Sequence, residues 1–251
     1  MKMTTNFSLV LPCYNEEENI FHLYNEFKTI PLSREKVELI FVNNGSTDNT
    51  EKKIDEILED AKSKINSGIV VKKVNLLKNQ GYGGGIAAGL NSSEGEYIGW
   101  THADLQTPLI DFYKLYVLIK GEKKILGKGN RINNRGFNGA ISRFHEIFAS
   151  LILGKNMREI NAQPKIFHKS MLRLFSKIPK QWTTIDTYVF YVCLLNKIKI
   201  VKMDVIFKSR TYGQSKWKSN FGIFFKHLFF NIIYLIKLRF STININYNDN
   251  N

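Results

Sequence analysis

The chain has 251 residues, which is long enough for one large domain, or two small ones, with a buried core. Hydrophobic residues make up 43% of it and charged residues 23%, close to globular averages, so wholesale disorder is excluded. The net charge is +14, but residues 1–106 carry −4 and residues 107–251 carry +18, which indicates that the second half faces an anionic partner.

The first half alternates between strand and helix patterns. In chain order we expect a strand over 7–12, a helix over 16–27, a strand over 37–42, a helix over about 48–62, a strand over 70–76, a helix over 86–90 after a glycine turn, and a strand over 97–101. This alternation predicts an α/β fold with a mostly parallel central sheet flanked by helices. Ligands of such sheets bind at the carboxyl ends of the strands.

The second half is less regular. We expect a strand over 125–131, an amphipathic helix over 138–153 and a strand over 198–208. No internal repeat and no linker rich in Pro, Gly or Ser divides the chain. The sequence therefore predicts one domain over 1–217, a helix over 218–240 and a polar tail over 241–251.

The predicted C-terminal helix is rich in Phe and Ile but also carries Lys226, Lys237 and Arg239. Its uncharged run of about ten residues is too short to span a bilayer, which takes roughly 20 apolar residues. A basic, aromatic helix suits the surface of a membrane, and packing in a core or a dimer is the alternative. Cys13 and Cys193 cannot form a disulfide framework, so we expect a reduced, cytoplasmic location.

Three polar loops follow predicted strands, at residues 12–16, 43–48 and 102–106. With the surrounding residues 9–20, 41–48 and 101–108, and with segments 127–131, 160–166 and 210–217, they resemble the family 2 glycosyltransferases of GT-A fold. The likeness is greatest to the branch of dolichol-phosphate mannosyltransferase and bacterial polyprenyl-phosphate glycosyltransferases, and it covers about residues 7–217. The glycines at 83 and 85 fit a dinucleotide-binding fingerprint only weakly.

The resemblance implies a nucleotide site and a metal site. The base and ribose would contact Pro12, Tyr14, Glu16, Asn43, Asn44, Ala103 and Asp104. The family usually has two aspartates where Asn43 and Asn44 stand, and a turn with a helix cap is the simpler explanation of that loop. Asp104, Gln106 and His102 would hold Mn²⁺ or Mg²⁺, with His102 replacing the first carboxylate of the usual Asp-x-Asp motif; imidazole suits Mn²⁺ better than Mg²⁺.

The resemblance also implies an acceptor site and a clamp for the diphosphate. Arg131, Ser142, Gln163 and Lys165 would bind the acceptor, because arginine grips phosphate with two parallel hydrogen bonds. Asp186 stands where the family keeps an acidic residue. Arg210 and Lys216 would close over the diphosphate, so the expected catalytic residues are Asp104, Arg131, Asp186, Arg210 and Lys216.

The expected activity is therefore inverting transfer of a sugar from a UDP- or GDP-sugar to a polyprenyl phosphate. We expect the protein to lie peripherally on the inner face of the cell membrane. Transfer to a hydroxyl of a lipid-linked or surface glycan is an alternative, in which Asp186 would be the base. A catalytically inactive relative and a nucleic-acid-binding basic protein are alternatives of other classes. The sequence leaves the sugar, the base and the oligomeric state open.

Overall fold

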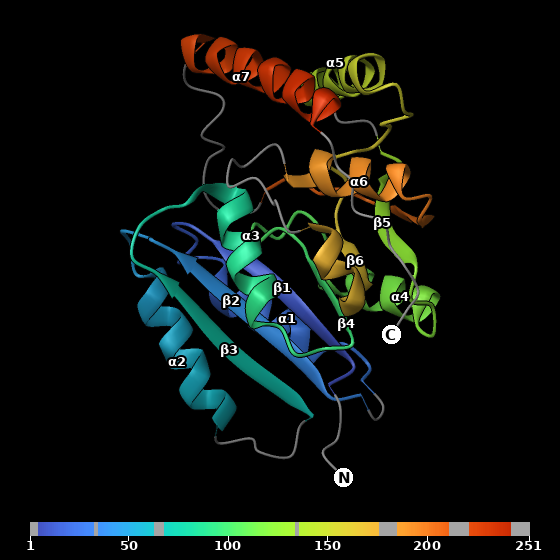
Figure 1. Ribbon diagram of the computed structural model, residues 1–251. Coiled ribbons are helices and arrows are strands. Elements are labelled where there is room, and N and C mark those ends of the chain that lie inside the picture. The colour runs from blue at the N-terminus through green and yellow to red at the C-terminus, as the bar shows by residue number, and fades with distance from the viewer. Residues whose placement is uncertain are drawn as a thin grey trace.

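The computed structural model describes residues 5–32, 35–62, 68–133, 136–175, 185–210 and 221–241. A seven-stranded sheet runs through the molecule, with helices on both of its faces (Figure 1). Its strands, in chain order, are β1 (Phe7–Cys13), β2 (Val37–Asn44), β3 (Ile69–Leu76), β4 (Tyr97–Trp100), β5 (Ile125–Arg131), β6 (Lys165–His168) and β7 (Lys199–Val205). The helices are α1 (Ile20–Lys28), α2 (Thr50–Lys62), α3 (Gly81–Ser92), α4 (Leu109–Ile119), α5 (Gly136–Leu153), α6 (Ile185–Leu195) and α7 (Phe221–Phe240), with a 3-10 helix, η1 (Lys169–Phe175), after β6.

The strand order is β3-β2-β1-β4-β6-β5-β7. All neighbouring strands are parallel except β6, which is antiparallel to both β4 and β5. The prediction of a mostly parallel α/β sheet is therefore confirmed. The sequence patterns did not predict α4, α6, β6 or η1, and they placed the start of α3 after the glycine turn, whereas the helix begins at Gly81.

Strand β6 fits between its neighbours because both carry glycine where the chains come closest. A Cβ atom at Gly99 in β4 would stand 2.0 Å from the carbonyl oxygen of Lys165. A Cβ atom at Gly129 in β5 would stand 2.1 Å from the carbonyl oxygen of Gln163. Glycine within a strand commonly marks such a close backbone approach.

The sheet separates two apolar cores, because successive side chains of a strand point to opposite faces. In β1, Phe7, Leu9 and Leu11 pack in the core under α1, α2 and α4. Val10 points to the other core, which contains Trp100 and Phe167 and lies under α3, α6 and η1. These buried strands hold the polar loops that follow them along one edge of the sheet.

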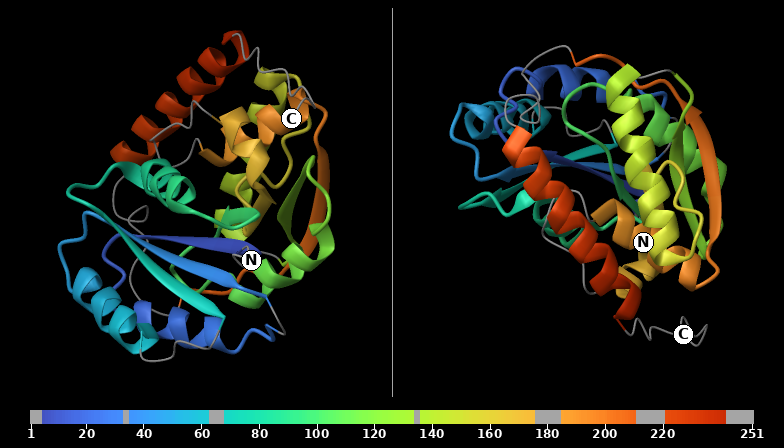
Figure 2. Two further views of the ribbon diagram at one scale, coloured as in Figure 1. Left: turned by 60° about the horizontal axis from the view of Figure 1, so that its bottom comes forward. Right: turned by 90° about the horizontal axis from the view of Figure 1, so that it is seen from above.

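Helices α5 and α7 lie together at one end of the molecule, and both are seen uncovered from above (Figure 1; Figure 2, right). The Arg239 Nη1 of α7 donates a hydrogen bond of 3.0 Å to the carbonyl oxygen of Leu153 in α5. Leu235 and Leu238 are buried in the core, so α7 packs against the domain with one face. Within the described part of the chain, no helix combines the length and the apolar character needed to cross a membrane.

Candidate active site

The ends of β1 and β4 bring Glu16 and Asp104 close to Arg210, which follows β7. Arg210 Nη2 donates to Asp104 Oδ2 at 2.9 Å, and the backbone N–H of Gln106 donates to Asp104 Oδ1 at 3.2 Å. Glu16 accepts a hydrogen bond from Asn19, yet burial raises the pKa of its carboxyl to about 7. The sequence had placed all three predicted groups at one edge, and the structure brings them together.

Gln106 joins the loop after β4 to the segment after β7. Its side-chain Nε2 donates to the carbonyl oxygen of Lys208 at 3.0 Å, and its own carbonyl oxygen accepts from the Lys208 N–H at 2.8 Å. These two hydrogen bonds hold the segment after β7 beside the loop after β4, so that Arg210 reaches Asp104. The side chain of Gln106, a predicted metal ligand, thus has a positioning contact of its own.

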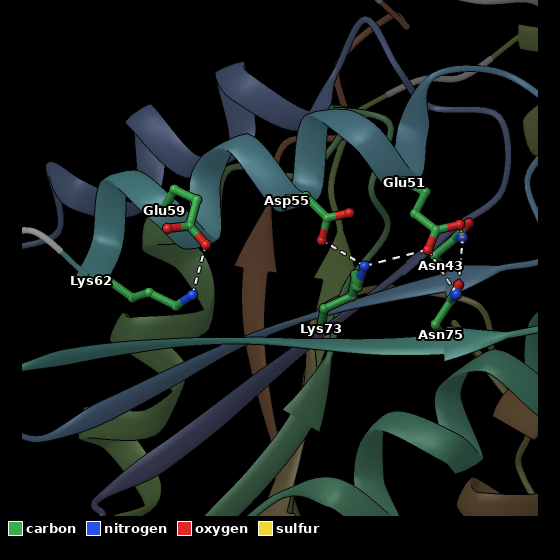
Figure 3. A network of polar contacts seen from close by, with 7 residues as sticks. All are labelled: Asn43, Glu51, Asp55, Glu59, Lys62, Lys73 and Asn75. Atoms are coloured by element: carbon green, nitrogen blue, oxygen red, sulfur yellow. Dashed lines mark hydrogen bonds and ion pairs between the residues drawn. The ribbon is translucent and has the colours of Figure 1, made fainter.

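Asn43 and Asn44 end β2, and their amides are bonded within the protein. Asn43 Nδ2 donates to Asn75 Oδ1 at 2.7 Å and to Glu51 Oε2 at 3.2 Å, and its Oδ1 accepts from the Ser46 N–H (Figure 3). Asn44 Nδ2 donates to the carbonyl oxygen of Gly81 at 2.9 Å, and its Oδ1 accepts from the N–H of Gln80.

These contacts explain why amides stand there. A carboxylate at position 44 could not donate to a carbonyl oxygen. The pair therefore fixes the loop and the start of α3, and a contact with a nucleotide base stays a prediction.

Tyr82 of α3 and His102 form a stacked aromatic pair, with ring centroids 5.3 Å apart and planes 22° apart. Burial raises the pKa of Tyr82, and the charges of Asp186 and Asp104 add to that effect. Burial lowers the pKa of His102, although Asp104 and Asp186 act in the opposite direction. Both carboxylates are therefore close enough to the stack to act on it. Tyr82 was not predicted as a site residue.

Asp186 is held by two residues that the family resemblance had placed near the acceptor. Asp186 Oδ1 accepts from Lys165 Nζ at 2.6 Å and from Gln163 Nε2 at 3.0 Å. All three side chains are buried. Burial lowers the pKa of Lys165, although the Asp186 carboxylate opposes that effect. The buried Gln163 Oε1 has no hydrogen-bond partner within the described structure, so an approaching donor group would satisfy it.

Arg131, the predicted ligand of the acceptor phosphate, lies at the end of β5. Its Nε donates to Glu159 Oε2 at 2.7 Å, and its Nη2 lies 3.6 Å from Glu146 Oε1 of α5. Within the described structure, Nη1 and Nη2 donate no hydrogen bond. The guanidinium is therefore positioned by the hydrogen bond of Nε to Glu159 and by the longer ion pair of Nη2 with Glu146.

Lys128, three residues before Arg131 in β5, is fully buried. Burial lowers its pKa to about 7, and the positive charge of Lys165 acts in the same direction. Sequence reasoning missed both Lys128 and Glu159. A lysine inside a predicted buried strand was the available signal for Lys128.

The other predicted residues are distributed around this site. Pro12 lies near the end of β1 and Tyr14 follows that strand, Ala103 is buried beside Asp104, and Ser142 lies on α5. Lys216 lies outside the described residues. No group of three His, Cys, Asp or Glu side chains within the described ranges could hold a metal ion by itself. Asp104 fits the alternative pattern, in which one carboxylate shares the cation with the phosphates of a substrate.

The sequence model of glycosyl transferase family 2 matches residues 8–182, which include the loops after β1, β2 and β4 and the Gln163–Lys165 segment. The chain belongs to glycosyl transferase family 2. This membership confirms the resemblance seen in the sequence.

Known relatives include lipid-phosphate sugar transferases. The undecaprenyl-phosphate 4-deoxy-4-formamido-L-arabinose transferase of Proteus mirabilis is 24% identical over 214 residues, which cover 84% of this chain and 62% of that protein. The human dolichyl-phosphate beta-glucosyltransferase is 26% identical over 222 residues, which cover 80% of this chain and 67% of that protein. The chain thus spans less than two thirds of the Proteus relative.

Solved structures show the same fold. TarS of S. aureus, residues 1–349, superposes with a TM-score of 0.63 at 19% identity, covering 96% of this chain and 67% of that one. Glucosyl-3-phosphoglycerate synthase of Mycobacterium tuberculosis, in complex with Mn²⁺, UDP and glucosyl-3-phosphoglycerate, gives 0.61 at 20% identity, covering 96% and 81%. The α/β architecture is therefore that of GT-A glycosyltransferases.

Proposed function

We propose that this family 2 glycosyltransferase moves a sugar, with inversion, from a UDP- or GDP-sugar to a polyprenyl phosphate at the cytoplasmic face of a membrane. The observation that carries the proposal is the presence of two charged pairs near the Tyr82–His102 stack. Arg210 is paired with Asp104, Lys165 is paired with Asp186, and both carboxylates act on His102. A donor diphosphate and an acceptor phosphate each need such a group.

The donor would bind at the carboxyl ends of β1, β2 and β4. Glu16 would accept from a ribose hydroxyl or a base N–H, and Arg210 would pair with the diphosphate as it leaves. A divalent cation on Asp104 would supply Lewis-acid stabilisation of the departing diphosphate. Because Arg210 already holds Asp104 Oδ2, Arg210 must turn from the carboxylate to the phosphates when the donor binds.

The acceptor would bind beside Arg131. Glu159 fixes the guanidinium through Nε, and a phosphate would take Nη2 over from its ion pair with Glu146 and bind the two terminal nitrogens. A phosphate nucleophile is already anionic and needs no strong base, which agrees with an Asp186 whose Oδ1 is occupied by Lys165 and Gln163. The names of the Proteus and human relatives, which are lipid-phosphate transferases, support the same acceptor class.

The membrane location follows from α7. Its described half exposes Phe229, Phe230 and Phe240 together with Lys237 and Arg239. Aromatic and basic side chains on one helix are typical of a helix that lies at a membrane surface. The basic second half of the chain adds attraction to anionic lipid, at about 1 kcal/mol for each residue near the surface.

The test is sugar transfer from a panel of UDP- and GDP-sugars to a short polyprenyl phosphate, with the matching polyprenol as control. We expect transfer to the phosphate alone, stimulated by Mn²⁺ or Mg²⁺. Calorimetry of UDP and GDP binding with and without the cation reads the donor site independently of turnover. Transfer to the polyprenol or to a glycan hydroxyl, abolished by Asp186→Asn with loss of the acidic limb of the pH profile, would replace the proposal by the hydroxyl acceptor. Nucleotide binding without any transfer would identify an inactive relative.

A further inference from the structure

The outward face of α5 is apolar. Phe144, Ile147, Phe148 and Leu151 are exposed, and Leu151 is 75% exposed. Their spacing of three, four and seven residues places them in one stripe along the helix. The opposite face, with Glu146, Ala149 and Leu153, is buried in the protein. A helix that presents its apolar stripe outward lacks the partner that would cover it.

Helix α7 extends this apolar surface. Phe229, Ile236 and Phe240, also exposed, are spaced by seven and four residues and so share a face of α7. The two helices contact each other through Arg239 and Leu153, and both are uncovered in the view from above (Figure 2, right). We call the exposed side chains of both helices the α5–α7 face.

The charges around the α5–α7 face favour one kind of partner. The only acidic residue in the two helices is Glu146, and it is buried. Arg143, Lys237 and Arg239 are exposed beside the apolar stripe. A second copy of this face would therefore meet like charge, whereas anionic lipid headgroups would meet opposite charge above an apolar layer.

We infer that the α5–α7 face is a docking surface for an anionic lipid bilayer, with α5 as a contact of its own beside α7. Long basic side chains at such a surface can place their charge among the headgroups while their stems cover apolar area. Binding to lipid requires only this face; its part in catalysis rests on the proposed function.

Docking by α5 would place the acceptor site directly below the lipid. Glu146 on the inner side of α5 lies 3.6 Å from Arg131 Nη2. A helix with its side chains is about 10–12 Å thick, so Arg131 lies about one helix diameter from the docked surface. A phosphate carried by a membrane-bound chain would reach Arg131 around the edge of α5, without leaving the interface.

The test is sedimentation with vesicles of phosphatidylcholine containing phosphatidylglycerol, and with phosphatidylcholine alone. We expect the wild-type chain to bind the anionic vesicles and Leu151→Glu to bind about ten- to hundredfold more weakly, because a buried leucine contact is lost and a negative charge is added. The matched control is Leu118→Glu on α4, which is 57% exposed at the other end of the molecule (Figure 1). This variant should bind vesicles like the wild type.

A second measurement places one thiol-reactive dye on an introduced cysteine. The two native cysteines, Cys13 and Cys193, are buried, so the dye should react with the introduced one. Leu151→Cys and Leu118→Cys, each labelled with an environment-sensitive dye, report contact with lipid without adding charge. We expect a blue shift with vesicles at position 151 and none at position 118.

Two results would overturn the inference. One is equal vesicle binding by Leu151→Glu and the wild type. The other is a lipid-independent dimer that Leu151→Glu dissociates while vesicle binding is unchanged, which would make the face a self-association surface. Transfer to a water-soluble acceptor, measured without vesicles, separates the lipid-docking inference from the proposed function. If the chain binds vesicles through Leu151 but transfers no sugar to that acceptor, only the proposed function is refuted.

Discussion

Two ion pairs near the Tyr82–His102 stack are stabilised differently. On the proposed donor side, Asp104 is paired with Arg210; their side chains are 8% and 29% exposed, and both residues come from loops after strands. On the acceptor side, Asp186 is paired with Lys165, and their side chains are 5% and 0% exposed. One ion pair lies near solvent, whereas the other lies inside the protein.

This difference has consequences for binding. An ion pair near solvent contributes little to stability and can exchange partners at small cost. A buried pair is costly to break, because the remaining charge has no water around it. The donor side can therefore rearrange when a nucleotide and a cation arrive, whereas the acceptor side is formed before any substrate binds.

The largest effect on activity should come from Asp104→Asn. The amide loses the charge that would share a cation with the diphosphate, and the transfer rate should fall by about 10²–10⁴-fold. Because Arg210 reaches solvent, the unfolding free energy should fall by less than the about 3–5 kcal/mol expected when a fully buried pair is broken. Steady-state transfer and urea unfolding measure the two quantities.

The matched control is Asp55→Asn on α2. Asp55 also pairs with a basic residue, Lys73, in a network between α2 and the strands β2 and β3 (Figure 3). It should leave the transfer rate unchanged. If Asp104→Asn instead unfolds the protein, the donor side is as rigid as the acceptor side and the comparison fails.

The next effect concerns stability. Lys165→Met removes the ammonium and leaves the Asp186 carboxylate buried without it, so the unfolding free energy should fall by about 3–5 kcal/mol. Urea unfolding followed by circular dichroism measures the loss.

Two variants test the cause of that loss. The double variant Lys165→Met with Asp186→Leu should recover most of the stability, because no charge remains buried. Lys73→Met, which breaks an exposed pair, should cost at most about 1 kcal/mol. A single variant as stable as the wild type would show that the acceptor side is not held by this pair.

The same contrast decides how much could be predicted from the sequence. Glu16 and Asp104 follow buried parallel strands, and Asn43 lies near the end of another; a parallel sheet brings such strand ends to one edge. Their neighbourhood was therefore predictable from strand ends alone. What the pattern could not provide was the hydrogen bonding of Asn43 and Asn44 within the protein, since an amide in a loop fits a ligand as well as a turn.

The acceptor side depends on β6, a strand of four residues that runs against its neighbours. Such a short segment has no readable periodicity, so the contact of Lys165 with Asp186 was not visible in the sequence. Gly99 and Gly129 were the available signal, because both admit the backbone of the β6 segment. Helices α4 and α6 were missed because apolar residues lie on most of their sides, as in helices buried within a protein.

A smaller effect should appear at Arg131. Arg131→Lys keeps the charge beside Glu159 but loses the planar fork, so the KM for the lipid phosphate should rise by about 10–100-fold. The KM for the nucleotide sugar should stay the same, and transfer assays at varied acceptor concentration separate the two. Arg158→Lys, an exposed arginine beside Glu159, is the control. An equal rise in both KM values would place Arg131 in the general structure of the site instead.

The last effect is a pH dependence of stability from Lys128. Burial lowers its pKa to about 7 from an ordinary 10.5, so between these values the unfolded chain binds more protons than the native one. The unfolding free energy should therefore rise with pH over this range, and the gain is lost as the pH falls to 7. Lys128→Met removes the rise, so its stability relative to the wild type should be highest near pH 7 and should fall toward pH 10, by up to about 1.4 kcal/mol for each pH unit. Urea unfolding at pH 7, 8.5 and 9.5 measures this, with Lys202→Met as control, because exposed Lys202 is the register partner of Lys128 in β7. If the unfolding free energies of the wild type and Lys128→Met change in parallel with pH, the buried amine stays charged. The proposed acceptor side would then hold a second buried cation beside Lys165.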